Sequence, residues 1–389
     1  MAVFLLFDLM VQADYINRRF IILNAPEAEI MLFYAALLIP AAIFTTNVEA
    51  QEMKWHDGVT LGMEGQGWTD IDSPYNRLPT RANGVVPESV WWLSTNSAGI
   101  CLYFRTDSPQ ITVRWTLKSD GLSMPHMPST GMSGVDLYAQ NPAATNPHNK
   151  WRWVATGTPA GKENEANFGV PAGMREYILN LPLYNGVEKL SVGISADATI
   201  EAAARTEKPV VIYGTSITQG GCAARPGMAH TSIISRWLDT PVVNLGFSGS
   251  GRMEPEMMKL IAELDASVFV LDCLPNLSPA EVTERIIPGV KTLRAAHPDT
   301  PIILVENIEY QSGWLNEGSR NDYVSKNNNL KAEYEKLLAQ GVTGLSYIEG
   351  LPLLGDDAEG TVDGVHPTDL GFIRMAEAFE PVIKAALGR

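Results

Sequence analysis

The sequence predicts an α/β fold, a doubly wound parallel five-stranded sheet preceded by an all-β sandwich. Three observations lead to this prediction. Residues 30–44 form a short apolar run ahead of the folded patterns. Residues 51–206 consist of short strand-like segments separated by turn residues, whereas residues 207–389 alternate short apolar runs with helical patterns. Runs of short strands favour a sandwich, and strand–helix alternation is typical of a parallel sheet covered on both faces.

Residues 1–50 are predicted to be a leader. The apolar run at 30–44 spans 15 residues, which is shorter than a spanning helix of ~20 residues and suits the core of a signal peptide. Val48 and Ala50 stand at the −3 and −1 positions of a cleavage site that follows this run. We therefore expect a secreted or periplasmic protein with no stable membrane insertion after processing.

The beginning of this leader leaves two alternatives open. Residues 1–30 are long for the segment that precedes a signal core, so we hypothesise that translation starts at Met31. The alternative is a membrane-anchored N-terminus. No cysteine precedes Cys101, which excludes a lipid-anchored start.

The composition argues against some classes of binding partner. The chain has 389 residues with 45% hydrophobic and 19% charged residues, which is typical of a globular protein. Its 29 basic and 44 acidic residues give a net charge of −15, which disfavours binding to nucleic acid. The cysteines Cys101, Cys222 and Cys273 form no C-x-x-C pair, so we expect neither a metal nor a cofactor. The composition does not indicate an oligomeric state.

The region 51–206 is predicted to be the N-terminal β-sandwich domain. Four segments carry alternating, β-branched or aromatic residues and are predicted strands: Ser89–Leu93, Ile100–Arg105, Gln110–Leu117 and Arg175–Leu181. Seven of the nine tryptophans lie in this region, and packing between two sheets is the favoured explanation. A platform on which sugars stack is the alternative.

The region 207–389 is predicted to be a flavodoxin-like domain with five parallel strands. The predicted strands are Pro209–Tyr213, Pro241–Leu245, Ser267–Asp272, Pro301–Glu306 and Thr343–Glu349. The predicted helices are His230–Asp239, Glu254–Leu264, Ala280–Ala296, Asn321–Gln340 and Leu370–Leu387. Ligands of such sheets bind beyond the carboxyl ends of the strands, so candidate site residues are sought there.

Three of these strand ends carry candidate residues. Ser216 follows the first strand in Y-G-T-S-I-T, where Gly214 allows a sharp turn that presents the hydroxyl. Gly249 lies in F-S-G after the second strand, where a backbone N–H can approach a developing oxyanion. Asn276 follows the third strand in L-P-N and can aim its amide at the same point. Each of these motifs is common as a structural turn when it occurs alone.

Asp363 and His366 complete the set of candidate catalytic residues. They stand in D-G-V-H, a spacing at which the carboxylate holds one imidazole nitrogen and leaves the other as a general base. The chain has six histidines, and only His366 combines a nearby carboxylate with a strand-end position. Metal binding is the rival role for this pair, but the spacing supplies no further ligand. Serine chemistry is therefore favoured.

These four motifs, in this order, resemble the marker blocks of the SGNH (GDSL-type) hydrolase superfamily. The segment G-V-D-L-Y at Gly134–Tyr138 resembles the N-terminal domain signature of one bacterial branch of these enzymes. The resemblance implies a serine nucleophile at Ser216 and an Asp363–His366 base pair. It further implies an oxyanion hole made of the N–H groups of Ser216 and Gly249 and the amide of Asn276.

The chain departs from the superfamily pattern at two places. Thr215 replaces the aspartate of G-D-S, and the usual G-x-N-D block reads Leu274–Leu277. The catalytic atoms remain, but substrate preference does not transfer from better-known members. We expect a secreted esterase that removes acetyl or other short acyl groups from carbohydrate. The alternatives are a lipid or lysophospholipid-type esterase, or a carbohydrate-binding protein with an inactive hydrolase domain.

Overall fold

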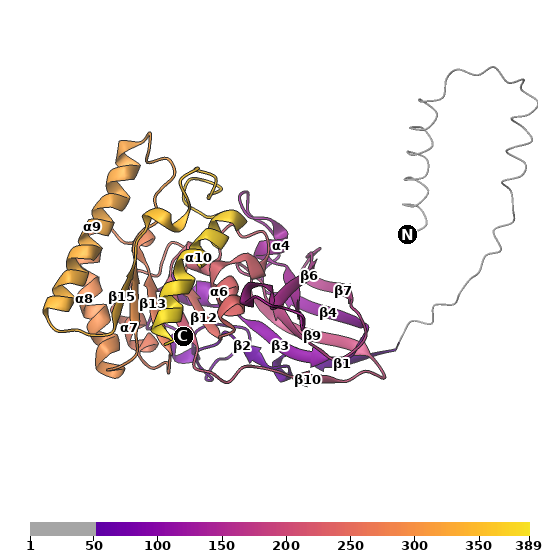
Figure 1. Ribbon diagram of the computed structural model, residues 1–389. Helices are drawn as coiled ribbons and strands as arrows, with labels where there is room; N and C mark the ends of the chain where they lie inside the picture. Colours follow the sequence, from indigo (N-terminus) through magenta and orange to yellow (C-terminus); the bar gives the residue numbers. More distant parts are fainter. Residues whose placement is uncertain (1–51) are drawn as a thin grey trace, which may run out of the picture. The chain divides into compact units, whose positions relative to one another are not determined.

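Five parallel strands form the sheet of the C-terminal region, in the spatial order β12-β11-β13-β14-β15 (Figure 1). The computed structural model describes residues 52–389, so the predicted leader at 1–50 lies outside the described residues. The strands are β11 (Val210–Gly214), β12 (Val242–Gly246), β13 (Val268–Asp272), β14 (Ile302–Val305) and β15 (Leu345–Ile348). The first strand of the region thus lies between the second and third, which confirms the doubly wound arrangement.

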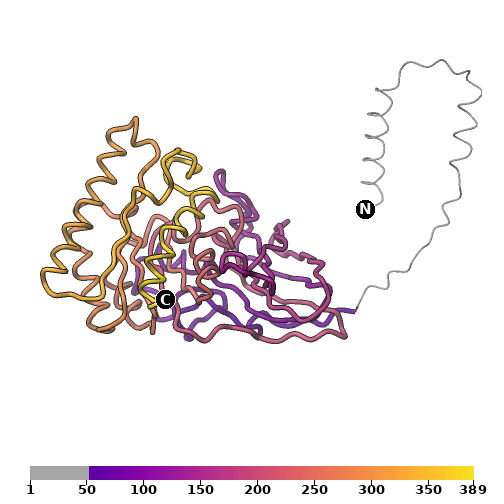
Figure 2. The backbone as a smooth tube through the Cα atoms, in the orientation of Figure 1, coloured from indigo at the N-terminus to yellow at the C-terminus, as the bar shows by residue number. Residues whose placement is uncertain are grey.

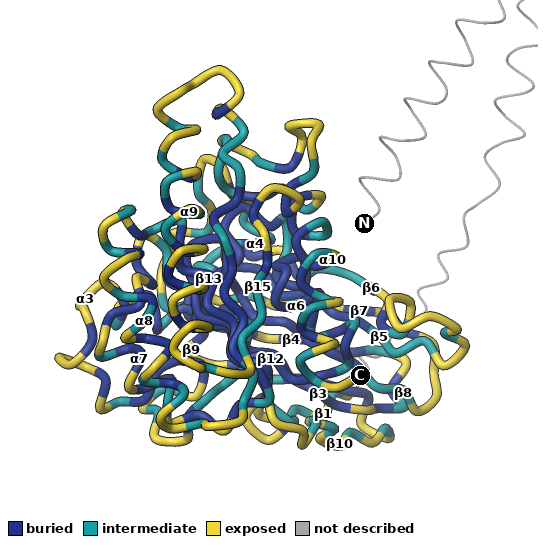
Figure 3. Tube along the Cα trace, turned by 60° about the vertical axis from the view of Figure 1, so that its left-hand side comes forward, coloured by how far each residue is buried: buried dark blue, intermediate teal, exposed yellow. Residues whose placement is uncertain are grey.

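Helices cover both faces of this sheet. They are α5 (Ser216–Gln219), α6 (His230–Leu238), α7 (Pro255–Ile261), α8 (Pro279–Ala296), α9 (Glu317–Ala339) and α10 (Asp369–Ala386). Helices α7, α8 and α9 pack on one face, while α6 and α10 pack on the other (Figure 1). Every residue of β11, β12 and β13 is buried, and the strands form the dark core in Figure 3. Burial on both faces explains why these strands read as continuous apolar runs. Within residues 52–389, no helix is long and apolar enough to span a bilayer.

Two antiparallel sheets form the N-terminal region. One has the order β1-β9-β4-β7, and the other has the order β10-β3-β8-β5-β6 with β2 paired to β3. Their bounds are β1 (Met53–Asp57), β2 (Met63–Glu64), β3 (Cys101–Thr106), β4 (Gln110–Leu117), β5 (Val135–Gln140), β6 (Trp151–Gly157), β7 (Glu163–Gly169), β8 (Arg175–Asn180), β9 (Val187–Ser195) and β10 (Ile200–Ala202). Figure 2 shows this region in indigo to magenta beside the orange and yellow helices of the C-terminal region.

The two sheets share one apolar core, which confirms the β-sandwich. Val113 and Trp115 of β4 pack with Phe104 of β3 and Leu179 of β8. Trp115 is 1% exposed, so core packing is the correct explanation for this tryptophan. Trp68 and Trp151 are also buried, whereas Trp92 and Trp153 are exposed.

One predicted strand of this region is wrong. Ser89–Leu93 lies in the helix α3 (Glu88–Ser94), although Val-Trp-Trp-Leu favours a strand. Pro87 precedes the helix and Glu88 stands in its first turn, both of which favour a helix start. Val90 and Leu93 are buried against the core of the C-terminal region, so tertiary packing overrides the local strand propensity.

The remaining helices are short. They are α4 (Ser129–Met132) and the 3₁₀ helices η1 (Gly58–Thr60), η2 (Thr80–Ala82), η3 (Pro147–Asn149), η4 (Pro226–Met228), η5 (Leu274–Asn276) and η6 (Leu351–Leu353). One of them, η5, directly follows β13 and contains the candidate residue Asn276, whereas η4 lies between α5 and α6.

A fully buried arginine joins the segment between β2 and β3 to the parallel sheet. Arg77 is 0% exposed, and its side chain donates to four backbone carbonyls at 2.6 to 3.3 Å, those of Leu93, Asn96, Asn244 and Gly246. Its guanidinium also lies 4.7 Å from the ring centroid of Phe247. Burial lowers the pKa of Arg77 to about 9, which leaves the side chain charged at neutral pH. The arginine therefore stabilises the carboxyl end of β12.

Replacing Arg77 should destabilise the fold strongly. Arg77→Met leaves four carbonyls without their donor, so the free energy of unfolding should fall by about 3–5 kcal/mol. Urea denaturation followed by circular dichroism measures the loss. The matched control is Arg81→Met, because Arg81 makes only exposed ion pairs with Asp70 and Glu263 and should shift the midpoint little. Equal losses in the two variants would contradict the role of Arg77.

Candidate active site

Ser216 lies at the turn between β11 and α5. Gly214 ends the strand, and a Cβ at this glycine would lie 2.0 Å from the hydroxyl oxygen of Thr218, so the close turn requires glycine. Thr215 caps the helix, because its hydroxyl accepts the backbone N–H of Ile217 at 3.3 Å. Ser216 is thereby the first residue of the helix and is 7% exposed. Thr215 thus serves as a cap in the position where the superfamily has aspartate.

His366 joins Ser216 to Asp363. The Oγ of Ser216 lies 2.9 Å from the Nε2 of His366, and the Nδ1 of His366 lies 2.7 Å from the Oδ2 of Asp363. The structure therefore brings together three of the five predicted site residues from two distant segments of the chain. The geometry is that of a nucleophile, a base and a group that orients the base.

The turn D-G-V-H holds Asp363 in place. The other carboxylate oxygen, Oδ1, accepts the backbone N–H groups of His366 at 2.7 Å and Val365 at 3.0 Å. Gly364 has a φ of +91°, a conformation that glycine adopts without strain. Burial raises the pKa of Asp363, but the hydrogen bonds from His366 and Val365 outweigh it and hold the pKa below its usual value. The carboxylate is therefore charged at neutral pH.

Gly249 and Asn276 lie in the loops that follow the two neighbours of β11. The side-chain amide of Asn276 donates to the backbone carbonyl of Ser250, so the two loops are joined beside Gly249. Gly251 lies against the Ser216 turn, since a Cβ there would lie 1.9 Å from the carbonyl oxygen of Gly214. Gly249 has a φ of +65°, and a Cβ at this glycine would meet nothing within 4 Å, so it faces open space. Both predicted residues thus border the edge that carries Ser216.

The N-terminal region also reaches this edge, which the sequence did not indicate. The hydroxyl of Tyr184 donates to the backbone carbonyl of Ser216 at 3.0 Å. Burial raises the pKa of Tyr184 well above its usual value, so the hydroxyl remains a donor. Tyr184 follows β8, and no motif distinguishes it from other aromatic residues of the sandwich. Only the contact between the two regions identifies it.

The segment G-V-D-L-Y contacts the loop after α5. Asp136 is 0% exposed, and its carboxylate accepts from Arg225 at 2.7 Å and from the backbone N–H of Gly227 at 3.1 Å. The Asn180 side chain donates to the same carboxylate at 2.9 Å. Tyr138 accepts from Arg225 as well. This segment therefore binds the sandwich to the loop that follows the candidate nucleophile.

Two further side chains lie beside His366. The ring centroid of His126 is 5.9 Å from that of His366, and one ligand atom each of His126, Cys222 and His366 lie within 4.8 Å of one another. Burial and the charge of Asp363 raise the pKa of the Cys222 thiol to about 12. The D-G-V-H motif alone contains no metal ligand beyond Asp363 and His366. In the folded chain, His126 of the sandwich region and Cys222 lie close to His366 and have atoms that could bind a metal.

Asp272 lies buried behind the Ser216 turn at the end of β13. Its Oδ2 accepts the hydroxyl of Thr218 at 2.8 Å, and the Nε2 of His230 is 3.9 Å away. Burial raises the pKa of Asp272 to about 7, although the bond from Thr218 opposes this shift. Burial also lowers the pKa of His230 to about 3. Burial therefore disfavours the ionised carboxylate of Asp272 and the protonated imidazole of His230.

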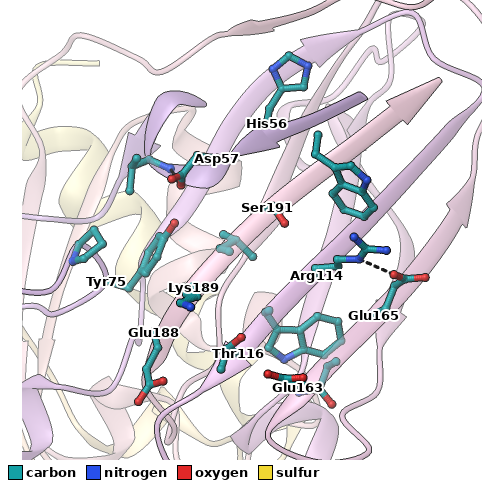
Figure 4. A pocket seen from close by; sticks show the side chains of 16 residues that line it. His56, Asp57, Tyr75, Arg114, Thr116, Glu163, Glu165, Glu188, Lys189 and Ser191 are labelled. Carbon is teal, nitrogen blue, oxygen red and sulfur yellow. Dashed lines mark hydrogen bonds and ion pairs between the residues drawn. The ribbon is translucent and has the colours of Figure 1, made fainter. Parts of the chain in front are cut away.

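A separate hollow of about 780 Å³ lies on the β1-β9-β4-β7 sheet (Figure 4). Arg114 lies 3.8 Å from the ring centroid of Trp55 and bonds to Glu165 at 2.6 Å. Gly193 also lies against this indole, since a Cβ there would lie 3.1 Å from the Trp55 ring. The hollow contains none of the predicted site residues.

Family comparisons agree with this fold. Residues 207–384 match the GDSL-like lipase/acylhydrolase family, and residues 53–200 match the GxDLY N-terminal domain of SGNH-type esterases. A GDSL-like lipase from Bacteroides ovatus has 36% sequence identity and a TM-score of 0.81, with coverage of 87% of this chain and 98% of that chain. The chain therefore belongs to the GDSL-like (SGNH) acylhydrolase family and is an ester hydrolase.

More distant solved structures share the fold. A salicylyl-acyltransferase from a tetracycline biosynthetic pathway has 21% identity and a TM-score of 0.70, with coverage of 86% and 98% of the two chains. A family two carbohydrate esterase from Cellvibrio japonicus has 12% identity and a TM-score of 0.58, with coverage of 87% and 98%. No curated protein sequence matches the chain.

The raised pKa of Asp272 predicts a pH-dependent difference in stability. The carboxyl group ionises near pH 4 when unfolded and near pH 7 when folded, so its contribution to stability is lost as the pH rises between these values. Asp272→Asn retains an acceptor for Thr218 and does not ionise. Relative to wild type, the variant should therefore gain roughly 2–4 kcal/mol in unfolding free energy between pH 4 and pH 7.5.

Urea denaturation of both proteins at several pH values measures this difference. His230 is present in both, so its own titration contributes equally to each. A difference in stability that is independent of pH would show that folding does not raise the pKa of Asp272.

Proposed function

We propose that the protein is a secreted serine esterase that removes acetyl or other short acyl groups from carbohydrate through a Ser-His-Asp acyl-enzyme mechanism. The observation that carries the mechanism is the chain of contacts from Ser216 through His366 to Asp363, at 2.9 and 2.7 Å. No cofactor enters this mechanism.

The reaction proceeds in two halves. The Nε2 of His366 takes the proton of Ser216 as the Oγ attacks the ester carbonyl, and Asp363 stabilises the imidazolium that forms. His366 then gives this proton to the leaving alcohol, which yields an acyl group on Ser216. Water, deprotonated by His366, attacks the acyl-enzyme and releases the carboxylic acid.

Three groups are proposed to stabilise the oxyanion. They are the backbone N–H groups of Ser216 and Gly249 and the side-chain amide of Asn276. One N–H of the Asn276 amide is used on the carbonyl of Ser250, which orients the side chain and leaves the second N–H for the substrate. The positive φ of Gly249 supports the proposal, because it lets the loop present its backbone to open space.

An exposed tryptophan beside the catalytic turn supports carbohydrate as the substrate class. Trp314 is 74% exposed and borders a hollow of about 280 Å³ together with Gln311, Asp356 and Asp357. The backbone N–H of Gln311 donates to the carbonyl of Gly364 at 2.9 Å, so this hollow adjoins the turn that carries His366. An aromatic face with carboxylates and an amide nearby suits a sugar, which presents both C–H faces and hydroxyls.

A lipid-type esterase is the second candidate. Leu315 is 77% exposed next to Trp314, and the pair forms an apolar surface that could contact an acyl chain. The chemistry at Ser216 would be the same, and only the length of the preferred acyl group would differ.

The proposed location is outside the cytoplasm, either secreted or periplasmic. The apolar run at 30–44 and the small residues Val48 and Ala50 support it. A glycan ester outside the cell suits this location, and the net charge of −15 opposes a nucleic-acid partner.

Substitution of the nucleophile and of an oxyanion donor should give graded losses. Ser216→Ala should abolish turnover of 4-nitrophenyl acetate, because it removes the hydroxyl that is proposed to form the acyl-enzyme. Asn276→Ala should lower kcat by about 10²–10³, since one oxyanion donor is removed. Steady-state kinetics measures both, with the urea midpoint of each variant as the control for folding. Wild-type turnover in Ser216→Ala would exclude the mechanism.

Replacing Trp314 should separate the two substrate classes. Trp314→Ala should raise KM for acetylated oligosaccharides while leaving 4-nitrophenyl acetate turnover unchanged, because only the sugar extends to the indole. Trp92→Ala is the matched control, since Trp92 is exposed on α3. Acetate release is measured on acetylated glycans, and turnover is measured on nitrophenyl esters of increasing chain length. A preference for long acyl chains without glycan deacetylation would favour the lipid-type esterase instead.

A further inference from the structure

Three side chains with nitrogen or sulfur ligands meet at the proposed active site. His126, Cys222 and His366 each place one ligand atom within 4.8 Å of the other two. Two ligands of a tetrahedral Zn²⁺ lie roughly 3.4–3.8 Å apart, given bond lengths of about 2.0–2.3 Å. The three ligand atoms therefore have to approach one another by at most about 1.4 Å to share an ion.

His126 can make this movement. It is exposed, and within residues 52–389 its ring makes no hydrogen bond that would have to be broken. Its backbone is held, because Met124 and Met127 on either side exchange two backbone hydrogen bonds at 3.0 Å. Met127 is 1% exposed in the core of the C-terminal region, which anchors this hairpin beside His366. The His126 side chain can therefore change its conformation, while its backbone is held beside His366.

Asp363 already orients His366 as a metal ligand requires. The imidazole that binds a metal through one nitrogen usually donates its other N–H to a carboxylate. The Nδ1 of His366 lies 2.7 Å from Asp363, so Nε2 is the nitrogen left for an ion. The same contact that prepares His366 as a base therefore prepares it as a ligand.

Cys222 is held beside His366 by an unusual backbone. Its φ is +76°, a left-handed conformation that strains a residue with a Cβ. The preceding residue, Gly221, lies against the ring, because a Cβ there would lie 3.3 Å from the Cδ2 of His366. The contacts of Gly221 and the strained φ together place the thiol next to the imidazole. The proposed reaction uses neither Cys222 nor His126.

We propose that His126, Cys222 and His366 form an inhibitory binding site for a Zn²⁺-class transition-metal ion. Two imidazoles and one thiolate suit Zn²⁺ or Co²⁺, and the fourth position stays open to water or to the Ser216 oxygen. The thiol gives its proton to solvent when the ion binds. The ion occupies the nitrogen that faces Ser216, so the esterase loses its base while the ion is bound.

The inhibition rests on the proposed function, whereas the binding does not, so the two are tested separately. Co²⁺ binding to a thiolate produces a charge-transfer absorption in the near ultraviolet. The full-length protein titrated with Co²⁺ should show this band, and Cys222→Ala should lose it. Cys101→Ala removes another buried thiol and should retain the band, as should Ser216→Ala, which leaves His126, Cys222 and His366 in place and lets water take the fourth position.

The second measurement is inhibition of 4-nitrophenyl acetate turnover by Zn²⁺. Wild type should be inhibited and should recover when EDTA is added. His126→Ala should retain its basal turnover and require at least about tenfold more Zn²⁺ for half-inhibition, since a ligand is lost. His148→Ala, an exposed histidine elsewhere, should behave as wild type. Mg²⁺ should have no effect, because it prefers oxygen ligands.

The outcomes separate the two proposals. A cobalt band that persists in Cys222→Ala, or equal Zn²⁺ sensitivity in His126→Ala and wild type, would overturn the metal site while leaving the esterase mechanism intact. Full turnover in Ser216→Ala together with a Cys222-dependent band would overturn the mechanism and retain the site.

Discussion

The contact between the Nδ1 of His366 and the Asp363 carboxylate, 2.7 Å long, determines what the site can do. It requires the ring proton on Nδ1 and therefore leaves a lone pair on Nε2, which faces Ser216. The turn D-G-V-H makes this arrangement local, since the other oxygen of Asp363 accepts two backbone N–H groups of the same turn. The remaining requirement on the fold is to place Ser216 next to an imidazole that Asp363 already orients. The same lone pair is the one that a transition-metal ion would take.

The sandwich contributes to the site as well as preceding it. Tyr184 bonds to the backbone of Ser216, Asp136 bonds to the loop after α5, and His126 reaches the His366 ring. Arg77 adds a fourth connection at the end of β12. Residues 52–389 form a single compact unit, which agrees with these shared contacts. The N-terminal region therefore supports the loops that carry the chemistry.

Much of this arrangement was predictable because it follows from local patterns. Strands buried on both faces gave continuous apolar runs, and parallel strands bring their carboxyl ends to one edge, so Ser216, Gly249 and Asn276 could be placed together. Asp363 and His366 are three residues apart, and their contact follows from a turn. The α3 helix was missed, since Val-Trp-Trp-Leu favours a strand, and the helix-start residues Pro87 and Glu88 were outweighed until the burial of Val90 and Leu93 was known. Tyr184 and His126 could not be predicted, because their roles depend on how one region packs against the other.

Trapping the acyl-enzyme tests most directly whether Ser216 is the nucleophile. The protein is mixed with excess 4-nitrophenyl acetate, quenched in acid within milliseconds to seconds, digested and analysed by mass spectrometry. We expect one acetyl group, carried by the peptide that contains Ser216 and located on that residue by fragmentation. An acetyl group on another residue during steady turnover, or active enzyme that never carries one at any quench time, would contradict this role of Ser216.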